Sequence, residues 1–125
     1  MAASLGSDCP FFLDRTPQLA QGRGELLRPV ALDLSGWWLT VVNPGIHVPT
    51  PEVYRHTAPT GQLLDLAQRL TTHPVEKWRE LVPNVIETYV FQAYPAVGEL
   101  KAKLLSMGAV YAAMSGSGST VYGLF

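Results

Sequence analysis

The hydrophobic pattern changes its period along the chain and predicts strands near both ends. Residues 26–32 and 37–42 are mostly apolar, with β-branched and aromatic positions, and a short turn separates them, which predicts two strands joined by a short loop. Residues 109–114 and 120–125 are also mostly apolar, and they flank the Ser/Gly segment 115–119. This second arrangement predicts another pair of strands, again connected by a loop.

The middle of the chain has a helical period instead. Apolar residues recur every three or four positions over 61–70 and again over 75–94, where Pro83 is expected to divide the stretch into two pieces. Residues 95–107 continue the pattern with a proline at the first position, and Gly108 is placed to cap this helix. The sequence therefore predicts a succession of helices between the two strand pairs.

Strands early, helices in the middle and strands late predict an α+β fold. We expect a mainly antiparallel four-stranded sheet that is covered by helices on one face. A chain of 125 residues fits a single domain, and no repeat or low-complexity linker divides residues 1–125.

Composition and charge argue against several classes of function. The net charge of −1, with no Lys/Arg cluster, does not favour binding to nucleic acid. Cys9 is the only cysteine, so no intrachain disulfide can form, and a reducing, cytoplasmic location is expected. No apolar run reaches the roughly 18 residues that a membrane helix needs. His47, His56 and His73 are too scattered to predict a metal site.

Asp8 is the first candidate for chemistry. It lies in a Gly-Ser-Asp-Cys-Pro turn, and an ionised carboxylate can accept a proton or a hydrogen bond from an attacking hydroxyl group. The alternative is an Asx turn, in which the side chain binds only local backbone. Spacing alone favours the turn.

The Ser/Gly segment 115–119 is the second candidate. Its glycines let the backbone approach a phosphate, and successive N–H groups can point at an anion. The segment lacks the Lys-Ser/Thr ending of a P-loop, and a strand rather than a helix is expected after it. A plain hairpin connection is therefore the alternative.

Thr50 and Tyr54 form the third candidate. The order Thr50, Pro51, Glu52 is typical of a helix start, with threonine as N-cap and proline at the first helical position. Such a helix presents Tyr54, whose ring can stack on a planar ligand. In nucleic-acid sites stacking of this kind contributes about 1–3 kcal/mol per base. In the alternative, Tyr54 makes only an apolar contact, and the cap interpretation of Thr50 is compatible with both.

Four segments together resemble a known enzyme family. They are LGSDCPFF at 5–12, GRGE at 22–25, PGIHVPTPEVY at 44–54 and MSGSG at 114–118. In order and spacing they are similar to the second half of the 4-diphosphocytidyl-2-C-methyl-D-erythritol kinases, members of the galactokinase, homoserine kinase, mevalonate kinase and phosphomevalonate kinase superfamily. The resemblance spans nearly the whole chain and implies the superfamily's C-terminal, substrate-binding domain.

The resemblance implies an activity and a role for each candidate. Members of the family use ATP and Mg²⁺ to phosphorylate the 2-hydroxyl of 4-diphosphocytidyl-2-C-methyl-D-erythritol in the non-mevalonate route to isoprenoids. The resemblance implies that the catalytic carboxylate, which activates or orients this hydroxyl, is Asp8. It also implies a substrate pocket, with an aromatic ring that stacks on cytosine, at Thr50, Pro51 and Tyr54. The loop that lies beside the ATP-phosphate loop matches Ser115, Gly116, Ser117 and Gly118.

The chain also departs from the family pattern. The Pro-x-Lys-x-Asn motif and the Gly/Ser-rich phosphate loop of the family's N-terminal, ATP-binding domain do not occur in these 125 residues. Many members carry an aspartate directly after the asparagine that matches Asn84, but this sequence has Val85 there. No role of that aspartate is therefore carried over to this chain. We expect a C-terminal piece of a longer kinase, truncated at both ends, which alone binds neither ATP nor Mg²⁺. Because phosphoryl transfer depends on loop amides, a lysine and Mg²⁺ around the transferred group, this piece alone is expected to be inactive.

The expected partners are the small-molecule substrate and the missing N-terminal domain. Surface that packs against that domain would be exposed without it, so self-association of the piece is expected. Two alternatives stay open. One is a stand-alone module that binds a cytidine diphosphate group without turnover, and the other is a structural interaction protein in which Asp8 has no role.

Overall fold

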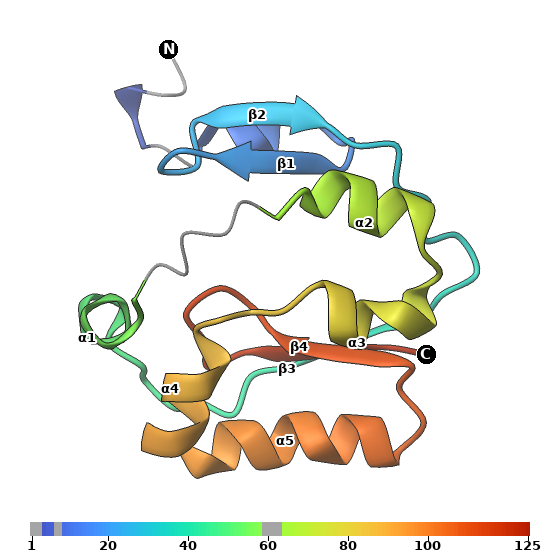
Figure 1. The fold of residues 1–125 in the computed structure, drawn as a ribbon. Helices are drawn as coiled ribbons and strands as arrows, with labels where there is room; N and C mark the ends of the chain where they lie inside the picture. The colour runs from blue at the N-terminus through green and yellow to red at the C-terminus, as the bar shows by residue number, and fades with distance from the viewer. Residues whose placement is uncertain (1–3, 7–8, 59–63) are drawn as a thin grey trace.

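The chain folds into two antiparallel sheets and a set of short helices (Figure 1). The computed structural model describes residues 4–6, 9–58 and 64–125. In chain order the described elements are η2 (Cys9–Leu13), β1 (Gln18–Gln21), β2 (Leu26–Pro29), β3 (Leu39–Val42), α1 (Thr50–His56), α2 (Leu66–Thr72), η3 (Val75–Lys77), α3 (Trp78–Leu81), α4 (Glu87–Ala93), α5 (Pro95–Ser106), β4 (Tyr111–Met114) and β5 (Val121–Leu124). This order of strands, helices and strands confirms the predicted α+β class.

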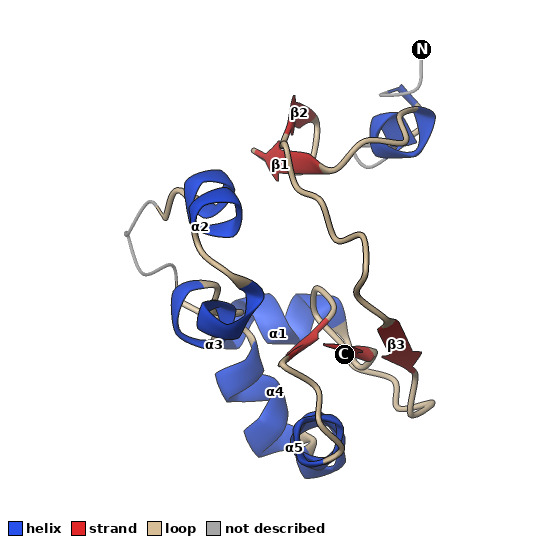
Figure 2. Cartoon of the chain, turned by 90° about the vertical axis from the view of Figure 1, so that its right-hand side faces the viewer, coloured by secondary structure: helices blue, strands red, loops and turns tan. Residues whose placement is uncertain are grey.

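The strands do not form one four-stranded sheet, and this part of the prediction is wrong. β2 pairs with β1, with Gln18 opposite Pro29, and the two form a separate hairpin. Figures 1 and 2 both show this hairpin apart from the other three strands. Gly22 and Gly24 lie between β1 and β2 with φ angles of 68° and 111°, values that side chains rarely tolerate but a tight connection uses. β1 was missed because a strand of sequence QLAQ has too few apolar residues to give a signal.

The second sheet has the strand order β3-β5-β4. β4 and β5 form the predicted hairpin, with Tyr111 opposite Leu124 and Met114 opposite Val121. β3 pairs with the other edge of β5. Just outside that ladder, Trp38 and Phe125 donate to each other's carbonyls at 2.9 Å. The predicted pairing of the strand at 37–42 with the strand before it is therefore replaced by a long-range pairing.

At β4 and β5 both faces of this sheet are covered, whereas only one covered face was predicted. All four residues of β4 are buried. Ala112 and Met114 belong to the cluster that contains Val97 and Leu104 of α5. Tyr111 and Ala113, which alternate with them along β4, pack on the opposite face with Trp78 of α3. Figure 1 shows α5 and α3 on opposite sides of β4. An uninterrupted apolar run such as YAAM is typical of a strand that is buried on both faces.

The helices follow the predicted order. The predicted helix at 61–70 is observed as α2, which begins later: Asp65 is its N-cap and accepts a hydrogen bond from the Gln68 N–H at 2.9 Å. Residues 59–63 lie outside the described part of the chain. The segment around Pro83 separates α3 from α4 as predicted, and α5 occupies most of the predicted 95–107. Within the described residues, no helix has the length and apolar character needed to cross a membrane.

The packing of α5 on the sheet can be tested with a truncation at Leu104, which is only 4% exposed. We expect Leu104→Ala to lower the free energy of unfolding by about 2–5 kcal/mol, because it removes buried methyl groups and leaves a cavity. Met107→Ala, at the exposed end of the same helix, is the matched control and should change it by less than about 0.5 kcal/mol. Chemical denaturation measures both values, and equal effects of the two substitutions would contradict this packing.

Candidate functional site

The Ser/Gly loop between β4 and β5 meets the start of α1. The hydroxyl of Thr50 lies 3.0 Å from the hydroxyl of Ser117, although 67 positions separate them in the sequence. On the same side, the Ser119 hydroxyl donates to the Ile46 carbonyl at 2.5 Å. Two of the three predicted candidate segments are therefore in direct contact.

The loop has the tight geometry of a glycine connection. The Gly118 N–H donates to the Ser115 carbonyl at 3.0 Å, and the Ser115 N–H donates across to the Thr120 carbonyl at 2.8 Å. Gly118 has a φ of 93°, and a Cβ atom there would lie 2.7 Å from the sulfur of Met114. The positive φ favours glycine at this position, and a larger residue would also have to displace the Met114 side chain. Gly116 has a φ of 54°, and its surroundings are open and exposed.

Thr50 is not the N-cap of α1, so the predicted cap is wrong. Pro49 occupies the N-cap position with no side-chain cap, and its carbonyl accepts from the N–H groups of Glu52 and Val53 at 2.9 and 3.2 Å. Thr50 is the first helical residue instead, and Pro51 follows it within the first turn, where proline costs no hydrogen bond. The Thr50 side chain can therefore contact Ser117.

Tyr54 lies on the exposed surface of α1. Its side chain is 64% exposed, while its neighbour Val53 is completely buried and anchors the helix in the core. An accessible ring on a fixed backbone can stack on a planar ligand.

Tyr89 of α4 holds α1 in place through two contacts. Its hydroxyl donates to the Glu52 carboxylate at 2.6 Å, and its ring stacks on the His56 ring with centroids 4.5 Å apart and planes 5° from parallel. The hydrogen bond to Glu52, helped by desolvation and by the carboxylate charge, raises the pKa of Tyr89 to about 12. Sequence reasoning missed this residue because 37 positions separate the hydrogen-bonded pair.

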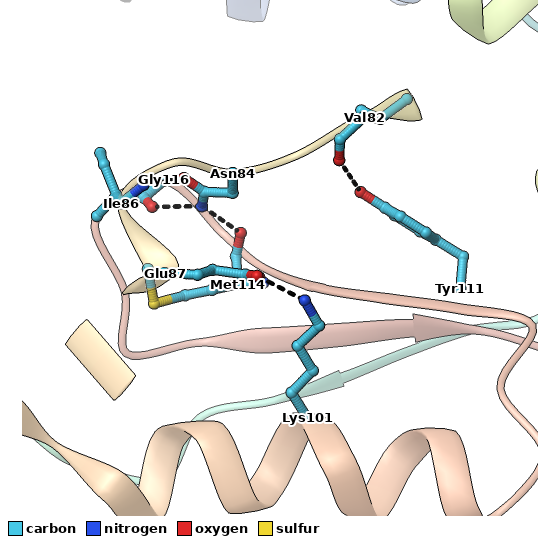
Figure 3. A network of polar contacts seen from close by, with 8 residues as sticks. All are labelled: Val82, Asn84, Ile86, Glu87, Lys101, Tyr111, Met114 and Gly116. Atoms are coloured by element: carbon cyan, nitrogen blue, oxygen red, sulfur yellow. Dashed lines mark hydrogen bonds and ion pairs between the residues drawn. The ribbon is translucent and has the colours of Figure 1, made fainter. Parts of the chain in front are cut away.

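A second polar network borders the loop on the side of α4 (Figure 3). Asn84 donates to the carbonyls of Met114 and Gly116, and the Glu87 carboxylate accepts from the Met114 N–H and pairs with Lys101. A cleft of about 790 Å³ lies beside this network, with Asn84, Glu87 and Lys101 among its lining residues. In the sequence, Asn84 stands where many family members carry Asn-Asp and was given no role, and Glu87 and Lys101 were not singled out.

Asp8, the predicted catalytic carboxylate, lies outside the described residues. Burial and the neighbouring phenol of Tyr122 raise the pKa of Tyr111. The Tyr111 hydroxyl donates to the Val82 carbonyl at 3.2 Å, and this contact is structural. Among the described residues, no three His, Cys, Asp or Glu side chains are grouped so that they could hold a metal ion.

Comparison with known proteins decides the family. Residues 58–125 match the family model described as "GHMP kinases C terminal". The chain belongs to this family. It is 41% identical over 124 residues to a 4-diphosphocytidyl-2-C-methyl-D-erythritol kinase of Bacteroides thetaiotaomicron, a match that covers 99% of this chain and 45% of the relative. It is 42% identical over 125 residues to the enzyme of the same name from Parabacteroides distasonis, which covers 100% of this chain and 46% of that relative.

A solved structure gives the same result for the fold. The crystal structure titled 4-(cytidine 5'-diphospho)-2C-methyl-D-erythritol kinase matches with a TM-score of 0.77 at 35% identity, over 98% of this chain and 45% of that one. The resemblance predicted from the four sequence segments is therefore confirmed, together with the C-terminal domain fold. The chain spans slightly less than half the length of the curated relatives that it matches.

The contact between Tyr89 and Glu52 predicts how stability depends on pH. Because the pKa of Tyr89 is raised from 10.0 to about 12 in the folded chain, its contribution to stability is complete below pH 10 and is lost as the pH rises toward 12. We expect the free energy of unfolding of the unmodified chain to fall more steeply between pH 10 and 12 than that of Tyr89→Phe.

Denaturation at a series of pH values measures this difference. Glu52→Gln is the second variant, since it keeps a hydrogen-bond acceptor but removes the negative charge beside the phenol, and its alkaline decline should be shallower than that of the unmodified chain. Parallel declines in all three proteins would contradict the assignment.

Proposed function

We propose that this GHMP kinase domain is the C-terminal, substrate-binding part of an ATP-dependent 4-diphosphocytidyl-2-C-methyl-D-erythritol kinase. The full-length enzyme transfers the γ-phosphate of ATP to the 2-hydroxyl of that substrate in the non-mevalonate pathway of isoprenoid biosynthesis. Relatives with this name align over the whole chain at about 40% identity, which supports the proposal. The main structural support is the 3.0 Å contact between the hydroxyls of Thr50 and Ser117. It brings α1, proposed to bind the substrate, against the loop at 115–118, proposed to lie beside the ATP phosphates.

The residues have distinct proposed roles. Asp8 activates or orients the attacking hydroxyl as a general base. Thr50 and Pro51 shape the substrate pocket, and the exposed ring of Tyr54 stacks on the cytosine. The loop at 115–118 lies beside the ATP phosphates, and its positive-φ glycines fit a backbone that approaches an anion closely. ATP and Mg²⁺, when bound to the full-length enzyme, supply the phosphoryl group and neutralise its charge.

We further propose that these 125 residues alone do not catalyse the reaction. Phosphoryl transfer is mostly positioning and charge neutralisation, and the lysine and phosphate loop of the family are absent from this sequence. We propose a cytoplasmic location for the full-length enzyme, because the single cysteine of this chain fits a reducing compartment.

Exposed apolar side chains close to the N-terminus of the chain indicate a surface that another protein segment covers. Leu5, Phe12 and Leu13 are 82%, 79% and 77% exposed, which is unusual for large apolar residues that lie close together in the sequence. We propose that the remaining part of the longer protein, which makes up over half of the matched relatives, packs on these side chains.

The kinase activity is tested with the full-length gene product, by coupled ADP release in the presence of the cytidylylated substrate, ATP and Mg²⁺. We expect turnover, and we expect Asp8→Asn to lower kcat by about 10²–10⁴-fold, as loss of a general base does. Tyr54→Ala should raise KM for the substrate by about 5–150-fold, because it removes ring stacking. Tyr54→Phe, which keeps the ring, is the matched control and should retain KM.

Two results would overturn the proposal: no turnover by the full-length product, or an Asp8→Asn variant with unchanged kcat. Binding of the substrate by this chain without turnover in any form of the protein would instead support a stand-alone cytidine-diphosphate module.

The exposed apolar surface predicts that the isolated 125-residue chain self-associates. Sedimentation velocity should show a mass that increases with concentration, since uncovered apolar side chains gain about 25 cal/mol for each Å² that they bury. Phe12→Ser combined with Leu13→Ser should shift the equilibrium toward monomer, whereas Met107→Ser, an exposed apolar residue at the end of α5, should not. A strictly monomeric unmodified chain at high concentration would contradict this prediction.

A further inference from the structure

We propose that Asn84 and Glu87 are positioning residues that set the direction of the loop amides at 115–117. The inference rests on the proposed kinase function for its catalytic consequence, while its geometry stands independently of that function. Asn84 lies in the short segment between α3 and α4, and Glu87 is the first residue of α4. Figure 3 shows both side chains directed at the point where β4 becomes the loop.

The side chain of Asn84 uses both ends of its amide. Its nitrogen donates to the Met114 carbonyl at 3.1 Å and to the Gly116 carbonyl at 3.0 Å. Its oxygen accepts from the Ile86 N–H at 3.2 Å, which fixes the orientation of the amide. Asparagine is specific here, because an aspartate of the same shape has no N–H to donate and would repel both carbonyls.

Glu87 holds the same turn through its carboxylate. One oxygen accepts from the Met114 N–H at 2.7 Å, and the other pairs with the Lys101 ammonium group at 2.5 Å. The carboxylate side chain is 13% exposed and the lysine side chain 26%. Lys101 of α5 therefore fixes the carboxylate, and the carboxylate fixes the backbone at Met114.

Part of this network has a purely structural purpose. β4 is an edge strand in the sheet order, so the backbone groups of Met114 on its outer side need partners other than a strand. The Gly116 carbonyl is different, because it lies beyond the end of β4, within the loop itself. A contact there is not required to complete the sheet.

Holding the Gly116 carbonyl determines the direction of the next amide. A trans peptide is planar, so the Ser117 N–H points away from the carbonyl that Asn84 binds. The same rule applies two residues earlier. The Met114 carbonyl is bound by Asn84, so the Ser115 N–H points the other way and reaches the Thr120 carbonyl at 2.8 Å. Asn84 thus directs the Ser117 amide away from α4.

The loop is consequently held from two sides. Asn84, just before α4, and Glu87, at its start, bind the loop on one side, and the contact between the hydroxyls of Thr50 and Ser117 holds it from α1. In the proposed kinase, an amide held in one direction is a donor for a phosphate oxygen and needs no rearrangement during the reaction. Loss of Asn84 is expected to affect the phosphate donor more than the cytidine part of the substrate.

The test combines two measurements on the full-length gene product. In ¹⁵N–¹H spectra, Asn84→Asp and Asn84→Ala should shift or broaden the Ser117 amide signal, while a core amide such as that of Val97 stays in place. In steady-state kinetics, the same variants should raise KM for ATP or lower kcat by about tenfold or more, with KM for the cytidylylated substrate within about twofold of the unmodified enzyme.

Two substitutions are controls. Asn43→Ala removes the other asparagine, which accepts from the Gly45 N–H in an exposed turn, and should leave the Ser117 signal unchanged. Glu87→Gln keeps an acceptor for the Met114 N–H and should have a smaller effect than Glu87→Ala.

The outcomes are separable. An unmoved Ser117 amide in both Asn84 variants would overturn the positioning role, as would equal changes in both KM values together with a general loss of stability. A moved amide in a protein without kinase activity would support the positioning role and overturn the proposed function alone.

Discussion

The central position of β5 is the constraint on which the rest of the structure depends. β5 pairs on one side with β4, its neighbour in sequence, and on the other with β3, more than 75 positions earlier. The long-range pairing brings the segment after β3 next to the segment before β5. As a result Ile46 and Thr50 reach the loop and contact Ser119 and Ser117. Without that pairing the two proposed ligand-binding segments would have no reason to meet.

Local features of this chain could be predicted from its sequence, and non-local ones could not. The helix that begins at Pro95, the break at Pro83 and the β4–β5 hairpin all follow from residues within one element or turn. The partner of β3 is β5, more than 75 positions later, and adjacency in the sequence predicted a pairing with β2 instead. β2 pairs with β1, the strand just before it, which the sequence pattern did not reveal. A four-residue strand with two glutamines, β1, carries almost no hydrophobic period at all.

The candidate site shows the same division. The loop glycines and the exposed Tyr54 could be found from composition and from the resemblance to a family. The partners that fix them could not: Tyr89, Asn84 and Glu87 act through hydrogen bonds to residues 27 to 37 positions away. The predicted cap at Thr50 failed for a related reason, since its hydroxyl has a distant partner, Ser117.

The loop at 115–118 and the first turn of α1 are proposed to form a single ligand site. A crystal structure of the full-length protein with the cytidylylated substrate and a non-hydrolysable ATP analogue tests this most directly. We expect the cytosine ring to lie against Tyr54 and the phosphates of the analogue to lie beside Ser117. A substrate bound instead in the cleft beside Glu87 and Lys101, with Tyr54 still exposed to solvent, would contradict it.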